Sequence, residues 1–226
     1  MPRMVFTLLC TVCAGLNLNH AGAAPCQTGG MPAPASLFGA DIPDGFHHRD
    51  NFVSTEEEAA LLAEIQRIEF STFEMRGVVA RRRVAFFGLS YDKGDAPPRP
   101  IPEFLFPLRD TFAAWAQLDP SAFAMSLINE YRPGAPIGWH RDATQYGIVA
   151  GLSLLSPCRM RFRPHVLPSE ASKQAIRRKT THEILLLPRS AYLMTGESRS
   201  HYEHSIPAVE RLRYSITFRT LRAAAA

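Results

Sequence analysis

The chain has 226 residues, of which 46% are hydrophobic and 20% charged, and its formal net charge is +4. This composition excludes an intrinsically disordered protein and fits one globular domain, and no apolar run reaches the ~20 residues that span a bilayer. Arg accounts for 22 of the 25 basic residues. Arg binds planar anions such as carboxylate and phosphate better than Lys, although codon bias in a GC-rich genome is an alternative explanation.

Residues 1–30 differ in character from the rest of the chain. They contain three of the four cysteines and an apolar run at 4–16, followed by small residues, which resembles a secretory signal. We favour the alternative that the start codon is assigned too early and that Met31 is the true start, because the chemistry inferred below needs cytosolic metabolites. Cys158 then has no partner for a disulfide, which fits a reducing, cytoplasmic compartment.

Residues 31–122 are predicted to form helices and strands that precede the main core. A helix begins after Ser54, because Glu57 follows three residues later in the capping-box pattern. A second helix ends before the Asp119-Pro120 pair. In chain order, we expect a short strand and turn at 46–52, the first helix, one or two strands at 77–91, a proline-rich loop at 95–102 and a helix at 104–118.

Residues 123–222 are predicted to form a β-core, and residues 31–222 together form one integrated domain. Short apolar or alternating runs between Pro and Gly turns are typical of an all-β barrel or jelly roll. The polar segment 165–181 interrupts this rhythm and is predicted to be an inserted loop. The predicted strands are 123–131, 147–155, 159–163, 183–187, 190–195, 202–206 and 213–219.

A candidate metal site begins with His140 and Asp142. On a strand, residues two apart point to the same side, so this imidazole and this carboxylate can hold one metal ion. The alternative is a solvated pair at a strand end. One further histidine would complete the facial triad that binds iron(II). His201 or His204 could supply it, and the spacing does not choose between them.

Two other strands carry polar side chains that could bind a small acid. Arg213 and Arg219 lie at the ends of one face of the strand 213–219 and could grip a short dicarboxylate, or could simply be solvated. On the strand 123–131, alternate residues from Phe123 onward share one face. That face ends in Asn129 and Tyr131, which a bound carboxylate would satisfy; the alternative is a strand end that reaches water.

Three runs together resemble the AlkB-like iron(II)/2-oxoglutarate-dependent dioxygenases: SLINEYRPGAPIGWHRD, LLLPRSAYLMTGESRSHYEHSIP and RLRYSITFR. The resemblance covers residues 46–219. It implies a mainly β fold with flanking helices (α+β), in which a double-stranded β-helix, or jelly roll, has N-terminal supporting helices and a substrate-recognition hairpin. It also implies Fe(2+) as cofactor, with 2-oxoglutarate and O2 as co-substrates.

Residue by residue, the resemblance makes His140, Asp142 and His204 the iron ligands. His204 is preferred because Ser-Ile follows it, similar to the family's His-Gly-Ile, from which Ser205 departs. The resemblance further implies that the distal carboxylate of 2-oxoglutarate binds Arg213 with help from Tyr131. The iron-chelating end of 2-oxoglutarate would lie near Arg219 and Asn129.

The implied reaction is hydroxylation, or oxidative demethylation, of alkylated bases in DNA or RNA. We also expect a monomer that does not bind membranes. Alternatives are the same chemistry on a protein or small molecule, and a non-catalytic nucleic-acid-binding module. Arginines beside aromatic side chains suit phosphate contact and base stacking, although a hairpin with a solvated arginine face would look the same. The candidate substrate residues are Arg81, Arg82, Arg83, Phe87, Tyr91, Trp139 and Tyr146.

Overall fold

A computed structural model describes residues 42–75, 78–89, 99–165 and 181–222. All of these belong to one compact unit, which spans residues 40–226. The expected leader at 1–30, the candidate substrate residue Tyr91 and most of the expected loop at 165–181 lie outside the described residues. Within the described residues, no helix is long and apolar enough to cross a membrane.

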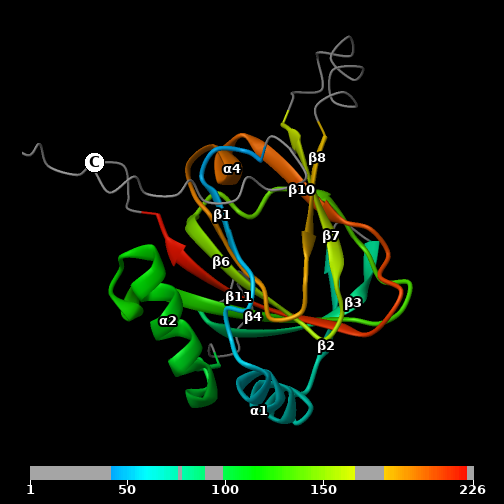
Figure 1. Cartoon of the computed structure of the whole chain (residues 1–226). Helices are drawn as coiled ribbons and strands as arrows, with labels where there is room; N and C mark the ends of the chain where they lie inside the picture. Colours follow the sequence, from blue (N-terminus) through cyan, green and yellow to red (C-terminus); the bar gives the residue numbers. More distant parts are fainter. Residues whose placement is uncertain (1–41, 76–77, 90–98, 166–180, 223–226) are drawn as a thin grey trace, which may run out of the picture. The chain divides into compact units, whose positions relative to one another are not determined.

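The described strands form two antiparallel sheets. The larger sheet has the order β1-β9-β6-β11-β4-β3-β2 and the smaller one the order β5-β10-β7-β8, and Figure 1 shows the smaller sheet opposite the larger. This arrangement confirms the predicted double-stranded β-helix. The strands are β1 (Phe46–Arg49), β2 (Ser71–Met75), β3 (Val78–Gly88), β4 (Phe123–Tyr131), β5 (Ile137–His140), β6 (Tyr146–Leu154), β7 (Cys158–Pro164), β8 (His182–Leu186), β9 (Ala191–Met194), β10 (Tyr202–Ile206) and β11 (Arg213–Leu221).

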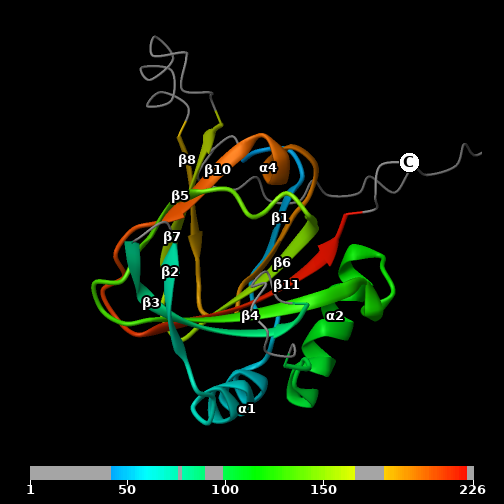
Figure 2. The ribbon, with the colours of Figure 1, turned by 180° about the vertical axis from the view of Figure 1, so that it is seen from behind.

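Two helices cover one face of the larger sheet (Figures 1 and 2). The predicted capping box is present at the start of α1 (Thr55–Ile65), where the Ser54 hydroxyl accepts from the Glu57 amide. The short 3-10 helix η1 (Glu103–Leu105) leads into α2 (Phe106–Ala116), and η2 (Pro120–Ala122) precedes β4. Phe112 of α2 packs in one buried cluster with Ile216 and Phe218 of β11, so this face is the main core.

The opposite face of the larger sheet looks toward the smaller sheet. β11 lies between β4 and β6, and its alternate residues therefore project into two different environments. One expectation is wrong here, because Phe123 does not share a face with Met125. The pairing of β4 with β11 shifts between these two residues, as a β-bulge does, and Phe123 joins the helix-side core instead.

Candidate functional site

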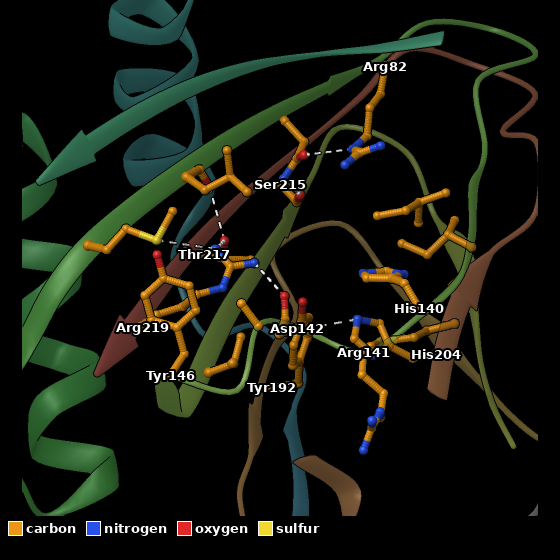
Figure 3. Close-up of a pocket in the computed structure, with 18 of the residues that line it drawn as sticks. Arg82, His140, Arg141, Asp142, Tyr146, Tyr192, His204, Ser215, Thr217 and Arg219 are labelled. Atoms are coloured by element: carbon orange, nitrogen blue, oxygen red, sulfur yellow. Dashed lines mark hydrogen bonds and ion pairs between the residues drawn. The ribbon is translucent and has the colours of Figure 1, made fainter. Parts of the chain in front are cut away.

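A cavity of about 460 Å³ lies between the two sheets (Figure 3). Its walls combine apolar side chains, such as Met125, Leu127 and Ile206, with a few charged and polar groups. This composition is typical of a small-molecule site, in which apolar walls exclude water and a small number of polar groups orient the ligand.

Three potential metal ligands meet at one side of the cavity. One ligand atom each from His140, Asp142 and His204 lies within 4.8 Å of the other two. His140 and His204 are directly opposite each other in the pairing of β5 with β10. The Nδ1 atom of His140 lies 2.8 Å from the carbonyl oxygen of Gly138, which can only accept, so Nδ1 carries the hydrogen and Nε2 stays available for a metal.

Of the two candidate histidines, the structure brings His204 into the cluster. His204 is buried in the cluster, whereas His201 is exposed three residues earlier. Asp142 reaches the cluster differently from the prediction, because β5 ends at His140 and Asp142 lies in the loop that follows. The position of Asp142 is fixed by Arg219, whose Nη2 donates to Oδ1 at 2.9 Å, rather than by strand geometry.

A buried arginine also fixes the loop that carries Asp142. Arg199 lies in α4 (Gly196–Ser200), and its Nη2 donates to the carbonyl oxygens of Ala143 and Tyr146 at 2.6 and 2.9 Å. One guanidinium thus joins the middle of the loop to the first residue of β6. The sequence gives no periodic signal for this role, because Arg199 contacts backbone atoms more than 50 residues earlier.

The charges of the cluster suit a divalent cation. Burial, with the neighbouring His140, lowers the pKa of His204 to about 3, and burial also lowers the pKa of His140. Burial alone would raise the pKa of Asp142, but the positive charge of Arg219 holds it below its ordinary value. At neutral pH both imidazoles are therefore neutral and the carboxylate is ionised, as metal ligation requires.

A buried arginine, Arg213, also lines the cavity. Arg213 is 1% exposed, its Nε donates to the Ser153 hydroxyl at 3.1 Å, and its guanidinium lies over the Tyr131 ring at 5.0 Å. Its Nη1 is buried and has no hydrogen-bond partner among the described residues. Because an unsatisfied buried charged donor is costly, this atom indicates a site for an anionic ligand.

Other side chains of β4 and β11 complete this region. The amide of Asn129 donates to the hydroxyl of Ser215 at 3.3 Å and accepts from Nε of Arg82 at 3.2 Å. Ser215 and Thr217 line the cavity, as their shared face with Arg213 suggests, although neither was a candidate site residue.

Tyr192 is a lining residue that the sequence did not single out. Its ring lies directly on Gly151, where an added Cβ would overlap the phenol ring. Burial raises the pKa of Tyr192, so the phenol stays protonated and can donate a hydrogen bond. The pairing of β6 with β9 places Tyr192 opposite Gly151, and the sequence offers no local signal for it.

The candidate substrate residues divide into two groups. Arg82 and Tyr146 line the cavity, as expected. Arg81 is exposed outside the lining and donates to the Gly134 carbonyl at 3.4 Å. The remaining described candidates, Arg83, Phe87 and Trp139, are also absent from the lining.

These absences have plain physical reasons. Arg83 lies on the other face of β3 from Arg82 and forms an ion pair with Glu130. Phe87 is buried in the helix-side core, and its neighbour Phe86 lines the cavity instead. Trp139 alternates with His140 on β5 and packs against the guanidinium of Arg163 at 4.3 Å from its ring centroid.

A double-stranded β-helix that holds two histidines and a carboxylate around one point defines the class of non-haem iron(II) oxygenases. The model of the 2OG-Fe(II) oxygenase superfamily matches residues 45–219, and the chain belongs to this family. The family implies Fe(2+), 2-oxoglutarate and O2, and the histidine–aspartate–histidine cluster and the unsatisfied donor of Arg213 fit these groups.

Several known proteins are similar to this chain. "Alkylated DNA repair protein ALKBH8 homolog" of Arabidopsis thaliana is 26% identical in an alignment 193 residues long that covers 77% of this chain and 54% of that protein. The chain thus spans about half the length of this relative. "Uncharacterized protein L905" of Acanthamoeba polyphaga mimivirus is 26% identical in an alignment 196 residues long that covers 79% of this chain and 85% of that protein.

Two solved structures share the fold. The structure of OsALKBH1 has a TM-score of 0.61 at 16% identity and covers 79% of this chain and 99% of its own. A Pseudomonas putida prolyl-4-hydroxylase has a TM-score of 0.52 at 17% identity and covers 80% of this chain and 94% of its own. At these identities the two structures establish the architecture alone.

Proposed function

We propose that the protein is an iron(II)- and 2-oxoglutarate-dependent dioxygenase that hydroxylates or oxidatively demethylates alkylated nucleic-acid bases. One observation carries the proposal: a single cavity contains a cluster of two histidines and one aspartate, together with a buried arginine that has an unsatisfied donor. A metal ion and an organic anion can therefore bind side by side. The proposed metal ligands are His140, Asp142 and His204, and the proposed 2-oxoglutarate residues are Asn129, Tyr131, Arg213 and Arg219.

When bound, iron(II) and 2-oxoglutarate supply the activation of O2 and the oxidation of a substrate C–H bond. The protein provides the geometry. Arg213 offers its buried Nη1 to the distal carboxylate, and Tyr131 holds the guanidinium in place by stacking. Arg219 keeps Asp142 ionised and oriented through its hydrogen bond. The apolar walls around Met125 and Leu127 limit the access of water.

The nucleic-acid part of the proposal has separate support. The Arabidopsis relative is named as an alkylated DNA repair protein, and Arg82 and Tyr146 offer the cavity a cation and an aromatic ring. The fold itself does not choose the substrate, because a prolyl-4-hydroxylase shares it. We therefore keep protein or small-molecule oxidation as the alternative to be tested.

A succinate assay tests both levels of the proposal. Purified protein is incubated with iron(II), ascorbate and 2-oxoglutarate, and succinate is measured with N-methylated oligonucleotides, with unmethylated ones and with peptides. We expect turnover that methylated oligonucleotides stimulate and that His140→Ala abolishes. Stimulation by peptides alone would contradict the nucleic-acid substrate, and no turnover under any condition would contradict the enzyme.

A further inference from the structure

The cavity contains a phenol group that belongs neither to the candidate metal ligands nor to the proposed 2-oxoglutarate residues. Tyr192 of β9 lines the cavity, and Figure 3 shows its side chain among the other lining residues. It is 7% exposed, and within the described part of the chain its ring stacks on Phe46 but its hydroxyl makes no hydrogen bond. Because polar groups in such places normally have a partner, this hydroxyl indicates a bound ligand.

Two neighbouring strands hold the Tyr192 ring in place. Tyr192 is directly opposite Gly151 in the pairing of β9 with β6, and its ring lies on the glycine backbone. A Cβ added to Gly151 would lie only 2.5 Å from the hydroxyl oxygen, so the ring fits there because residue 151 has no side chain. Phe46 of β1 stacks on the same ring, with 5.7 Å between the ring centroids and 18° between the planes. The hydroxyl is therefore positioned before any ligand binds.

The Tyr192 hydroxyl lies beside the strand that carries the two co-substrate arginines. The end of the phenol lies over Gly151, and the partner of Gly151 on β11 is Thr217. Thr217 lies between Arg213 and Arg219 on the face of β11 that lines the cavity. The side chain of Tyr192 thus extends across β6 toward the part of β11 that lies between the two ends of the proposed 2-oxoglutarate site.

The charges around the phenol relate it to Arg213 more than to the metal cluster. Burial raises the pKa of Tyr192, and Arg213 opposes this rise with a larger effect than that of Asp142. The phenol is therefore protonated at neutral pH and offers one hydrogen, and the unsatisfied Nη1 of Arg213 offers another. A carboxylate has two oxygen atoms and can accept from both donors at once.

We propose that Tyr192 is a further co-substrate-binding residue, whose hydroxyl donates a hydrogen bond to the same distal carboxylate of 2-oxoglutarate that Arg213 binds. The inference rests on the proposed function, because it takes Arg213 as a co-substrate residue. It also gives Gly151 a role, since any larger residue there would displace the phenol ring. Tyr192 then increases the selectivity of the site for a 2-oxo acid with a second carboxylate over one with an apolar end.

A thermodynamic cycle with two ligands and one hydroxyl deletion tests this contact. The ligands are 2-oxoglutarate and 2-oxopentanoate, which has the same chain length but a methyl group in place of the distal carboxylate. Binding to Mn(II)-loaded protein is measured by calorimetry without oxygen, and 2-oxopentanoate is measured by competition with 2-oxoglutarate. Tyr192→Phe should weaken 2-oxoglutarate binding roughly tenfold or more, as for a hydrogen bond to a charged group, and should leave 2-oxopentanoate binding unchanged.

Two controls separate this contact from a structural role of the hydroxyl. Tyr202→Phe makes the same change on β10, outside the cavity lining, and should behave as the unaltered protein. In urea denaturation without ligands, Tyr192→Phe should be at least as stable as the unaltered protein, because its hydroxyl has no partner to lose among the described residues. A clear loss of stability in Tyr192→Phe, or equal weakening of both ligands, would overturn the inference.

The same titrations separate this inference from the proposed function. No 2-oxoglutarate binding by the unaltered, Mn(II)-loaded protein would contradict the proposed function itself. Equal 2-oxoglutarate affinity in the unaltered protein and in Tyr192→Phe would contradict only the role of Tyr192. Mn(II) affinity should be the same in both proteins, because Tyr192 is not in the metal cluster. A loss of Mn(II) affinity in Tyr192→Phe would relate the hydroxyl to the metal instead and so overturn the inference.

Discussion

The two faces of β11 have very different surroundings. On one face, Arg213 and Arg219 line the cavity between the sheets; on the other, Ile216 and Phe218 pack under the two helices. One face of β11 therefore lines the site and the other packs in the core, and the sheet lies between the two. Changes at adjacent positions of β11 should therefore have separable effects, on ligand binding for one face and on stability for the other.

The largest effect on function should come from the cavity side of the molecule. His204→Ala removes one of three candidate ligands, and we expect Mn(II) affinity to fall by about a hundredfold or more and succinate formation to disappear. His201→Ala is the matched control, because that histidine is exposed outside the cluster. Metal titration by calorimetry checks this, and equal losses in both variants would contradict the assignment of His204.

The largest effect on stability should come from the helix side. Phe218 is fully buried against Phe112 and Phe123, and Phe218→Ala should lower the free energy of unfolding by about 3–5 kcal/mol. Urea denaturation measures this change. The fraction that stays folded should bind 2-oxoglutarate with near-normal affinity. A selective loss of 2-oxoglutarate binding without destabilisation would show that the two faces are not separable.

A smaller effect on function is expected when Arg213 keeps its positive charge but loses the planar shape of the guanidinium. Arg213→Lys replaces a planar fork with a point charge, so the 2-oxoglutarate concentration for half-maximal turnover should rise roughly tenfold. Mn(II) affinity should stay nearly intact, because Arg213 is not in the metal cluster. Steady-state kinetics and metal titration together check this prediction. An unchanged requirement for 2-oxoglutarate would remove Arg213 from the co-substrate site.

The smallest effect concerns an ion pair on the outer face of β3 and β4. The hydrogen bond from Arg83 holds the pKa of Glu130 below its ordinary value of 4.5. The stabilisation is therefore complete at neutral pH and is lost as the pH falls below about 4.5 and through the lower pKa of the folded state. Because Arg83 is about a third exposed, we expect only about 1 kcal/mol.

A pair of denaturation series measures this term. The difference in unfolding free energy between the unaltered protein and Glu130→Gln should be largest near pH 7 and should shrink toward pH 3. A difference that stayed constant or grew on acidification would contradict the assigned ion pair. Metal and 2-oxoglutarate binding at neutral pH should be unaffected, because Glu130 points away from the cavity.

Much of the architecture was predictable because the local signals agree with the fold. The capping box at Ser54 and Glu57 starts a helix in the structure as in the sequence. Strands 123–131 and 202–206 have their predicted bounds, since turn residues flank alternating runs on both sides. The candidate co-substrate residues also follow from alternation, because a period of two assigns Arg213 and Arg219 to one face without further information.

Alternation by itself did not show which of two faces looks inward. Phe87 was predicted to contact substrate because it lies near three arginines, but it packs under the helices and Phe86 lines the cavity. Alternation placed Phe123 beside Met125, although a register shift between them reverses the order of the faces. Both errors have one cause, because face assignment depends on pairing with strands that are distant in sequence.

The sequence by itself determined which residue types share a strand face and which motifs occur, and these indicated an iron and 2-oxoglutarate site. The tertiary structure determined which of these residues meet in the site. Pairing of β5 with β10 placed His204 opposite His140, and Arg219 together with the Arg199 clamp placed Asp142 beside them after the strand had ended. The physical reason is separation along the chain. Strand geometry fixes neighbours two residues apart, whereas this metal site joins residues more than 60 positions apart, and only the folded sheets bring those together.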